Sequence, residues 1–489
     1  MMWFRNDLRV HDNPALYNAS DYAKQVGVPL VGVFLYAPEE WESHDLAPVK
    51  LDLIKRTLLK LEAKLESLGI PLNTMLVPSG SRSSTVLADF AQAEGARCVF
   101  YNVEYEVDER VRDGEFEKLA VKHGFLVRHF DDQCVVRPGE VMTQAGTMSK
   151  IFTPFKKAWI KHLEAKGFEI SPTPHQQKLV RKVKSDSFPV FELSKELREC
   201  GERDWPAGED AALERMQEFL KERVIGYKEQ RDFPESPGTS RISAYLAIGA
   251  LSIRMCLQAA LNANHKKYDT GNTGVVQWIS ELVWREFYRN ILFHYPNVCR
   301  GQPFQALTNK VAWRGYVVGA DAHAEADFEA WKQGKTGYPL VDAAMRCLLA
   351  TGWMHNRLRM LTAMFLSKDL LVWWPRGESF FMRHLVDGDF SSNNGGWQWS
   401  ASTGTDSQPY FRIFNPLLQS ERFDAKGEFI RRWVPELRGV EGKAVHAPFE
   451  RLPREQFEKL AYPKSIVDHN QARKRCLDAF VKVMKKSSS

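Results

Sequence analysis

Cysteine is scarce in this sequence, and no two cysteines lie at the short spacing of a CxxC pair. The chain of 489 residues contains seven cysteines, at positions 98, 134, 200, 256, 299, 347 and 476. Disulfide frameworks use even numbers of cysteines, and zinc sites use closely spaced ones. The scattered positions favour neither arrangement, and we expect no bound metal.

Long apolar runs and a targeting leader are also missing. The apolar segment at 29–37 is much shorter than the roughly 20 residues that cross a bilayer. No basic, then apolar, then small-residue leader precedes it, so we expect a cytoplasmic protein without a membrane partner. The chain is 44% hydrophobic and 26% charged, which excludes a disordered or collagen-like protein.

Positive charge and tryptophan are concentrated in the later part of the chain. Residues 1–130 hold 15 Lys and Arg against 19 Asp and Glu, a net of −4, which leaves 52 against 42, a net of +10, for the remainder. Nine of the 14 tryptophans lie between 278 and 399. Any contact with nucleic acid therefore belongs to the later part.

The first ~130 residues alternate between strand and helix patterns. Short apolar segments at 28–36, 71–77, 97–102 and 125–130 predict buried strands. Helical spacing predicts helices from Leu51 to Leu68, around 83–94 and around 108–123. This alternation is typical of a Rossmann-like parallel sheet with helices on both faces. No GxGxxG follows the first strand, so a dinucleotide on the usual Rossmann turn is not supported.

The remainder of the chain predicts a long connector and then helices. Prolines 172, 174, 189 and 206 mark 165–210 as a surface connector, and helical patterns follow almost throughout. The fold class is therefore α/β plus all-α. We expect an α/β domain over 1–130, a connector over 131–206 and an all-helical domain over 207–489.

Three segments of the helical part combine residues that carry chemistry. The first, GTSRIS at 238–243, places hydroxyls and a guanidinium before a helical run. Free amides at a helix start and these side chains suit a phosphate group, although an ordinary Ser or Thr N-cap is the better explanation of the segment taken alone. In the second, WISELVWREFYRN at 278–290, Trp278, Glu281, Arg285 and Tyr288 share one helix face. A carboxylate among tryptophans is costly unless it is hydrogen-bonded.

The third segment is a pair of motifs, GWMHNRLRM at 352–360 and DGDFSSNNGGWQW at 387–399. The first predicts a helix, and the second predicts a loop whose backbone approaches a ligand closely. Ion pairs between its aspartates and Arg357 or Arg359 would orient a cofactor, or they would be purely structural. Together the segments indicate an aromatic-lined pocket for a flat, phosphate-bearing ligand, with a basic surround that fits nucleic acid.

These segments resemble the photolyase/cryptochrome family, and within it the bacterial class I photolyases that repair cyclobutane pyrimidine dimers. The matching motifs occur in family order: WFRNDLRVHDNPAL (3–16), FTPFKKAW (152–159), QRDFP (230–234), GTSRIS (238–243), ELVWREFYRN (281–290), GKTGYPLVDAAMR (334–346), GWMHNRLRM (352–360), DGDFSSNNGGWQWSASTGTD (387–406) and PYFRIFNP (409–416). The resemblance implies an N-terminal antenna domain and a helical domain that holds FAD in a U-shaped conformation. It also implies a lyase that uses light and FADH⁻ to split dimers flipped out of UV-damaged DNA, without sequence preference.

The resemblance assigns roles to individual residues. The implied FAD contacts are Tyr227, Thr239, Ser240, Arg241, Ile242, Ser243, Trp278, Glu281, Arg285, Asn356, Arg359, Asp387, Asp389 and Asn393. The implied lesion contacts are Trp284, Trp399, Asn356, Arg357 and Met360, with Glu281 as a further contact. Glu281, Asn393, Trp284, Trp399 and Arg357 form the implied catalytic set, and Trp397, Trp374 and Trp313 the implied electron relay.

The antenna chromophore is less closely specified. His44, Asp108, Glu109 and Arg300 correspond to the family's site for 5,10-methenyltetrahydrofolate. Asp108 stands where that pattern usually has Asn, and an ionised Asp cannot donate the amide hydrogen bond. A folate antenna is therefore favoured, and 8-hydroxy-5-deazaflavin or FMN remains an alternative.

Two other functions stay open at this stage. A cryptochrome-like photoreceptor would bind FAD without repair, but this chain keeps Trp284, Trp399 and Asn393, which such receptors commonly lose. A helical nucleic-acid-binding protein would bind no flavin. Asn356 and Met360 replace the paired histidines expected of (6-4) photolyases. We expect a monomer without an obligate protein partner, associated with the nucleoid through DNA.

Overall fold

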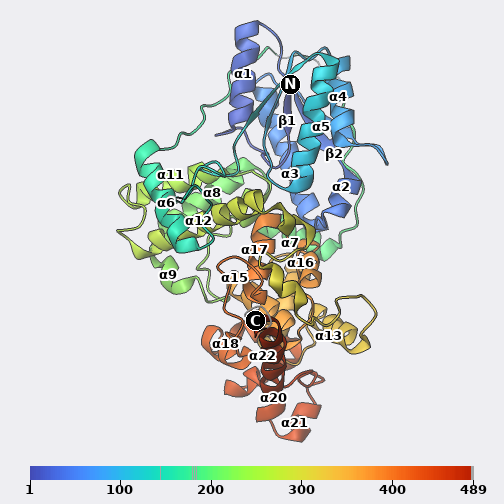
Figure 1. Ribbon diagram of the computed structural model, residues 1–489, viewed down its shortest axis with the longest axis vertical. Helices are drawn as coiled ribbons and strands as arrows, with labels where there is room; N and C mark the ends of the chain where they lie inside the picture. The colour runs from blue at the N-terminus through green and yellow to red at the C-terminus, as the bar shows by residue number, and fades with distance from the viewer. Residues whose placement is uncertain (144, 179, 181, 183, 486–489) are drawn as a thin grey trace. The chain divides into compact units, whose positions relative to one another are not determined.

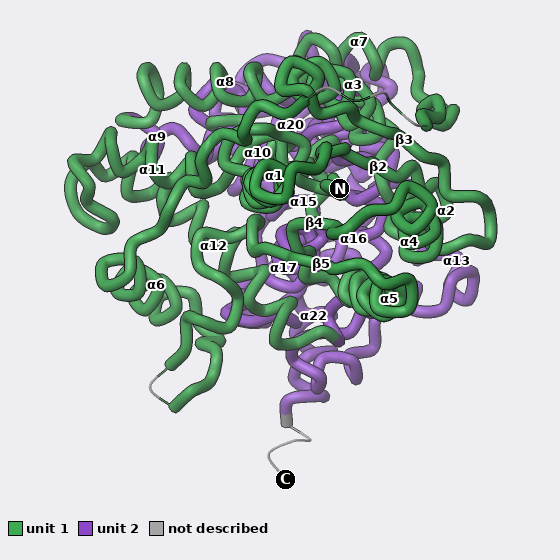
Figure 2. Tube along the Cα trace, turned by 90° about the horizontal axis from the view of Figure 1, so that it is seen from above, with its two compact units in different colours: residues 1–225, 240–296, 386–389 green, residues 226–239, 297–385, 390–489 purple. Residues whose placement is uncertain are grey.

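The computed structural model describes residues 1–143, 145–178, 180, 182 and 184–485. Its contacts divide the chain into two compact units, shown in different colours in Figure 2. The first unit comprises 1–225, 240–296 and 386–389, and the second comprises 226–239, 297–385 and 390–489. The chain thus passes between the units several times. The sequence-based domain boundaries at 130 and 206 follow chain order and stay a prediction.

A five-stranded parallel sheet forms the start of the first unit. The strands are β1 (Met2–Phe4), β2 (Gly32–Tyr36), β3 (Leu72–Leu76), β4 (Cys98–Asn102) and β5 (Leu126–Phe130), in the order β3-β2-β1-β4-β5. Every neighbouring pair is parallel, for example β1 with β2 through Trp3 and Val33. The predicted parallel sheet is confirmed.

Helices connect these strands along the chain (Figure 1). They are α1 (Pro14–Val26), α2 (Pro38–Ser43), α3 (Pro48–Ser67), α4 (Ser83–Ala93) and α5 (Val107–His123). Asn13 caps α1 by accepting a hydrogen bond from the Leu16 amide, and Gly27 ends it with a φ of 72°. Such a left-handed residue favours glycine, so local sequence sets both ends of the helix.

The rest of the first unit is helical and includes part of the predicted connector. It contains α6 (Phe152–Lys166), α7 (Lys195–Asp204), α8 (Glu209–Glu222), α10 (Ser243–Ala247), α11 (Ile253–Ala263) and α12 (Thr273–His294). Helix α7 lies inside the predicted surface connector, so part of that segment is helical. Ser194 caps α7 through the Leu197 amide, a signal that the prolines around it obscured.

The second unit is built from helices and short helical turns. It contains α9 (Tyr227–Gln230), η3 (Ala306–Lys310), α13 (Ala322–Lys332), α14 (Pro339–Thr351), α15 (Asn356–Met364), η4 (Phe365–Asp369), α16 (Trp374–Met382), α17 (Phe390–Ala401), α18 (Pro416–Phe423), α19 (Glu428–Trp433), η5 (Pro435–Leu437), η6 (Gly442–His446), α20 (Pro448–Arg451), α21 (Arg454–Glu458) and α22 (His469–Lys485). The turns η1 (Val224–Gly226) and η2 (Pro296–Arg300) lie at the changes from one unit to the other. Within the described ranges, no helix is long and apolar enough to cross a bilayer.

Residues 390–399 are helical, and the predicted loop was wrong there. Only Asp387, Gly388 and Asp389 precede α17 as irregular backbone. The helix tolerates its serines, asparagines and glycines because it is anchored by buried side chains. Gln398 donates to Asn394 at 2.9 Å, one turn apart. Packing therefore overrides the low helix propensity of this segment.

Candidate cofactor and substrate site

The GTSRIS segment forms a tight turn that leads into helix α10. Arg241 has a φ of 50°, and α10 begins at Ser243. Ser243 Oγ donates to Asp387 Oδ2 at 2.6 Å, which ties this turn to a segment 144 residues further along the chain. Hydroxyls, a guanidinium and backbone amides are thereby gathered in one place of the first unit. Such a set of donors fits a pyrophosphate.

One face of α12 lies next to this turn. Trp278 is 2% exposed, and its Nε1 donates to Ser240 Oγ at 3.4 Å. Glu281 accepts a hydrogen bond from Gln277 Nε2 at 2.8 Å, so the carboxylate among aromatic residues is hydrogen-bonded. The predicted helix is confirmed, and its Trp278 contacts the GTSRIS turn.

Asp389 forms a buried ion-pair cluster with two arginines of α12. Its Oδ2 lies 3.0 Å from Arg285 and 2.6 Å from Arg289. Burial lowers the pKa of Arg285, whereas Asp389 and Glu106 raise that of Arg289 against the effect of burial. Arg289 was missed at the sequence level, although its spacing of four from Arg285 places both on one face.

A buried lysine holds the backbone of the same segment. Lys50 of α3 is 6% exposed and donates to the Gly388 carbonyl at 2.7 Å. Burial lowers the pKa of Lys50, while Asp389 partly offsets this effect. The short segment 386–389 is thus held by Lys50 at the Gly388 carbonyl and by two arginines of α12 at the Asp389 side chain. The sequence offered no signal for Lys50, because it lies within an ordinary amphipathic helix.

Trp284 lies on α12 and stacks on a neighbouring aromatic ring. The ring centroids of Trp284 and Phe152 are 3.7 Å apart, and their planes differ by 4°. Phe287 and Tyr288 pack against the same indole at 5.5 Å. Trp284 remains only half-buried, so an aromatic platform with a preset orientation is available for a flat partner.

In the second unit, helix α15 presents the predicted group of polar residues. His355 caps it by accepting from the Arg357 amide, and Asn356 Nδ2 lies 3.8 Å from Met360 Sδ. Arg357 pairs with Asp232 at 2.9 Å and lies 4.4 Å over the Phe423 ring. Asp232 belongs to the QRDFP motif but was not assigned a role at the sequence level.

Burial keeps His355 neutral. The side chain is 2% exposed, and desolvation lowers its pKa to about 4. Its Nε2 has no hydrogen-bond partner among the residues that the structure describes. A neutral imidazole can accept from the Arg357 amide, which a protonated one could not do. The cap of α15 therefore depends on this protonation state.

Asn393 has a fixed amide orientation. Its Nδ2 donates to the Glu378 carbonyl at 3.0 Å, and a carbonyl can only accept. The amide oxygen of Asn393 is therefore left as a free acceptor within the described part of the chain. The buried carboxylate of Glu378 also accepts from Asn394 Nδ2 at 3.1 Å, so the backbone carbonyl and the side chain of Glu378 each hold one of two neighbouring amides. Sequence reasoning missed Glu378.

Trp397 packs directly against helix α16. A Cβ added to Gly377 would lie 2.1 Å from the ring of Trp397, so the indole occupies the space that this glycine leaves. Trp374 lies three residues before Gly377, on the same face of α16. Trp397 and Trp374 are 2% and 1% exposed, respectively. The predicted relay residues thus share one packed region of the second unit.

Trp313 lies on a segment paired with the one that precedes Trp374. Arg314 donates to the Leu371 carbonyl at 2.8 Å, and Trp373 donates to the Arg314 carbonyl at 3.0 Å. Trp313 is 8% exposed and meets the Phe480 ring edge-on at 5.8 Å. It is the most exposed of the three tryptophans, next to the surface of the unit.

The remaining predicted residues have these positions. Tyr227 is buried at the start of α9, with Arg231 5.5 Å over its ring, and Thr239 ends the 226–239 segment of the second unit. Ile242 is buried before α10. Arg359 donates to the Met354 carbonyl at 2.7 Å, and half-buried Trp399 lies on α17.

Three of the four predicted antenna residues come together in the first unit. His44 lies 3.4 Å from Asp108 and 3.3 Å from Glu109. Burial, followed by Glu106 and Glu104, raises the pKa of Glu109 to about 8. Arg300 belongs to the second unit. No cluster of three or more His, Cys, Asp or Glu suited to a metal occurs in the described ranges.

Comparison with known proteins gives two family matches. The profile described as the FAD binding domain of DNA photolyase matches residues 278–482, and the one described as DNA photolyase matches residues 1–177. Together the two matched segments cover most of both units. They include α12, α15, α17 and the parallel sheet.

Relatives match over nearly the whole chain. A protein named deoxyribodipyrimidine photo-lyase from Neurospora crassa is 43% identical over 98% of this chain and 80% of its own length. One of the same name from Escherichia coli is 42% identical over 98% of both chains. The crystal structure of a class III photolyase from Agrobacterium tumefaciens has a TM-score of 0.86 and 33% identity, covering 99% of this chain and 97% of its own. A Synechocystis cryptochrome has a TM-score of 0.83 at 27% identity, covering 98% of each.

Proposed function

The chain belongs to the DNA photolyase family and is a light-dependent DNA repair enzyme that binds FAD, and we propose how its residues carry out the repair of cyclobutane pyrimidine dimers. Two contacts carry this proposal. Trp284 stacks on Phe152, and the Asn393 amide is fixed by the Glu378 carbonyl. The first suits a flipped-out pyrimidine dimer, and the second suits a reduced flavin.

The donor set of the first unit fits the phosphates of FAD. Ser240, Ser243 and the amides of α10 supply hydrogen bonds, and Arg241 supplies positive charge. Asp387 orients the Ser243 hydroxyl, since it accepts that hydroxyl's hydrogen at 2.6 Å. We assign the same role in cofactor binding to Thr239 and Tyr227, which precede this turn in the chain.

Asn393 is proposed to hold the flavin in its reduced form. Its amide oxygen is free to accept, because the amide nitrogen is committed to the Glu378 carbonyl. A reduced flavin carries a hydrogen on N5 that can donate to such an oxygen, whereas oxidised N5 is itself an acceptor. When bound, excited FADH⁻ supplies the electron that opens the cyclobutane ring and later takes it back.

Trp284 and Trp399 are proposed to pack on the dimer once it has left the helix. A dimer disrupts base pairing and stacking, which lowers the cost of flipping it and supplies selectivity. Asn356, Arg357 and Met360 present hydrogen-bonding and thioether groups from α15. Arg357 is proposed to stabilise the negative charge that the dimer gains, and Glu281, held by Gln277, is proposed as a further contact of the dimer.

Trp397, Trp374 and Trp313 are proposed to carry electrons from the surface of the second unit to the flavin. Support comes from the packing of Trp397 against α16 and from the pairing of the Trp313 segment with residues 371–373. Trp397 Nε1 has no hydrogen-bond partner among the described residues. Without a nearby acceptor, its oxidised ring keeps its proton and passes the charge onward.

His44, Asp108, Glu109 and Arg300 are proposed to bind the antenna, with 5,10-methenyltetrahydrofolate as the first candidate. Glu109 is protonated at neutral pH, since burial raises its pKa to about 8. A protonated carboxyl can donate a hydrogen bond, as an amide does. This supports a folate despite Asp108. The absorption spectrum of the purified protein distinguishes folate from deazaflavin or FMN.

DNA is the partner, and we infer that the enzyme works as a cytoplasmic monomer at the nucleoid. The net charge of +10 on residues 131–489 favours backbone contacts without sequence preference, and affinity should fall steeply with salt. Light scattering of the holoenzyme with and without a short duplex measures the stoichiometry. A stable dimer in both samples would contradict this inference.

The proposed function is tested by comparing binding before and after illumination. Reduced holoenzyme should retain a thymine-dimer duplex over an undamaged one in the dark and should release it after blue light. The similarity to a cryptochrome raises the alternative of a receptor that binds FAD without repair. A duplex that stays bound after illumination, with its thymine dimer unrepaired, would favour that alternative.

A further inference from the structure

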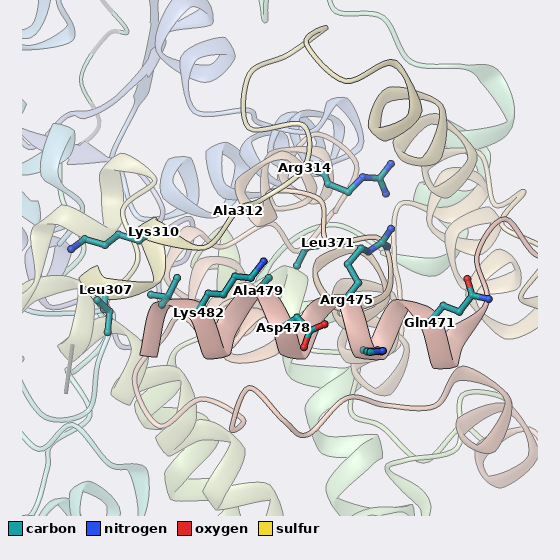
Figure 3. A pocket seen from close by; sticks show the side chains of 12 residues that line it. Leu307, Lys310, Ala312, Arg314, Leu371, Gln471, Arg475, Asp478, Ala479 and Lys482 are labelled. Carbon is teal, nitrogen blue, oxygen red and sulfur yellow. The ribbon is translucent and has the colours of Figure 1, made fainter. Parts of the chain in front are cut away.

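A basic cavity lies on the second unit beside Trp313. Its volume is about 830 Å³, and it is formed by helix α22 and by residues 307–314 with Leu371 (Figure 3). Lys310, Ala312 and Arg314 line it on one side, so the segment that carries Trp313 forms one wall. This cavity contains none of the residues assigned to FAD, lesion or antenna.

The cavity is lined by sequence neighbours of Trp313 and by a sequence neighbour of Phe480, the ring that Trp313 touches. Ala312 and Arg314, the sequence neighbours of Trp313, both line it. On α22, Phe480 touches the indole edge-on, and its neighbour Ala479 lines the cavity. The indole is therefore behind the wall, within the first layer of side chains from the cavity.

The charge of the cavity is strongly positive. Lys310, Lys474 and Lys482 line it, are exposed, and have no ion-pair partner in the described part of the chain. Asp478 is the single acidic side chain among the lining residues. An exposed, unpaired set of three ammonium groups around a cavity attracts small anions.

Two arginines add to this positive charge. Arg314 and Arg475 lie on opposite walls and extend in the same direction (Figure 3). Arg314 is paired with Asp327 at 2.8 Å, whereas Arg475 donates to the Asp369 carbonyl. Burial and then Arg314 lower the pKa of Arg475, and Asp327 partly offsets this effect.

The floor of the cavity is apolar. Leu307, Leu371, Ala479 and Val483 provide it. A floor of this kind within a cationic rim suits a small organic anion better than the phosphate backbone of a duplex, which needs an open, polar surface. The occupant must also have a reason to lie against Trp313.

We propose that this cavity binds a small organic anion of the enediolate class, which re-reduces Trp313 after the electron relay has oxidised it. The proposal rests on the relay assigned to Trp313 under the proposed function. The oxidised indole gains one electron and returns to neutral tryptophan. The bound monoanion loses that electron to give a neutral radical, which releases its proton to solvent and becomes a radical anion. The cationic rim thus holds the electron donor near the oxidised indole of Trp313.

The test uses ascorbate as the probe and compares three variants of the FAD-loaded protein. Lys474→Glu and Lys482→Glu reverse charge inside the cavity. Arg473→Glu makes the same charge change on the same helix at an exposed residue that does not line the cavity. Saturation-transfer NMR measures ascorbate binding without any photochemistry. We expect binding to wild type and Arg473→Glu, and its loss in both cavity variants.

The second readout is the lifetime of the tryptophan radical after a laser flash. In wild type, its decay rate should rise with ascorbate and level off at high concentration. Both cavity variants should decay about threefold to tenfold more slowly, as expected for lost electrostatic attraction. Decay with neutral ferrocenemethanol should be the same in all proteins.

The outcomes separate the cavity from the relay. If no tryptophan radical forms while ascorbate binding depends on Lys474 and Lys482, the relay assignment fails and the anion site stands. If ascorbate does not bind, or Arg473→Glu has the same effect as the cavity variants, the proposal is overturned. It is also overturned if the cavity variants weaken binding of undamaged duplex more than Arg473→Glu does, since the cavity would then belong to the DNA surface.

Discussion

The indole of Trp284 and the ring of Phe152 are stacked almost parallel, with centroids 3.7 Å apart. Phe152 therefore covers one face of the tryptophan, which remains half-buried. Aromatic pairs of this kind contribute about 0.5–1.5 kcal/mol beyond buried area. The orientation of Trp284 is thus set by a residue outside the group proposed to contact the lesion.

Phe152→Ala should weaken binding of dimer-containing DNA about twofold to tenfold, because the indole loses its support and pays more entropy on stacking. FAD content should not change. Filter binding of reduced protein in the dark measures the affinity. Phe152→Tyr is the matched control, since it keeps the aromatic face, and equal affinities of the two variants would contradict the supporting role.

Gly377→Ala should slow photoreduction of bound FAD, because a methyl group there would lie 2.1 Å from the ring of Trp397. Overpacking of this kind costs about 1–3 kcal/mol and should also lower the melting temperature. Gly396→Ala is the control, since its methyl group meets no atom within 4 Å. Continuous illumination with a reductant gives the rate; equal rates in both variants would mean that the position of Trp397 does not matter.

Trp313→Phe should slow photoreduction at least about tenfold, because phenylalanine is much harder to oxidise than tryptophan and the relay loses its surface member. Repair by protein that has been reduced beforehand should be unchanged, as no electron then has to enter from the surface. Trp433→Phe, at a tryptophan that packs on Phe429, is the control. Loss of repair by pre-reduced Trp313→Phe would show that the relay assignment is wrong.

His355 should make the protein less stable as pH falls from about 6.5 to about 4. Over this window the unfolded chain binds a proton on His355 and the folded chain does not, so protons favour unfolding. The free energy of unfolding should drop by up to about 1.4 kcal/mol per pH unit relative to a non-titrating variant. His355→Asn keeps an N-cap side chain and removes the titration.

Urea denaturation of wild type and His355→Asn across this range measures the difference. The free energies of the two proteins should run parallel above pH 7 and diverge below it. Parallel curves throughout would indicate that His355 takes up its proton in the folded state as readily as in the unfolded one.

The fold could be predicted to a large extent from local patterns. Buried strands such as Cys98–Asn102 and amphipathic helices such as Pro48–Ser67 carry their period in the sequence. Helix α17 could not be predicted, because its serines, asparagines and glycines favour a loop. It is held by contacts that are distant in the chain, such as Asn394 with Glu378.

The candidate site shows the same difference between residues in local motifs and residues that act through contacts distant in the chain. Residues that belong to continuous motifs, such as Trp284 and Asn393, could be proposed from the sequence, and their roles stay predictions. Their supports could not, since Phe152 lies 132 residues before Trp284 and Lys50 lies 338 residues before Gly388. Neither support lies in a pattern that points to its partner. Only folding brings these pairs together.

The most direct measurement is repair by reduced holoenzyme of an oligonucleotide with a single thymine dimer. Blue light should restore two thymines in a quantity that grows with illumination, as quantified by chromatography of the digested product, and the dark sample should stay unchanged. An illuminated sample in which the dimer persists, with FAD bound and reduced throughout, would contradict the assignment as a repair enzyme.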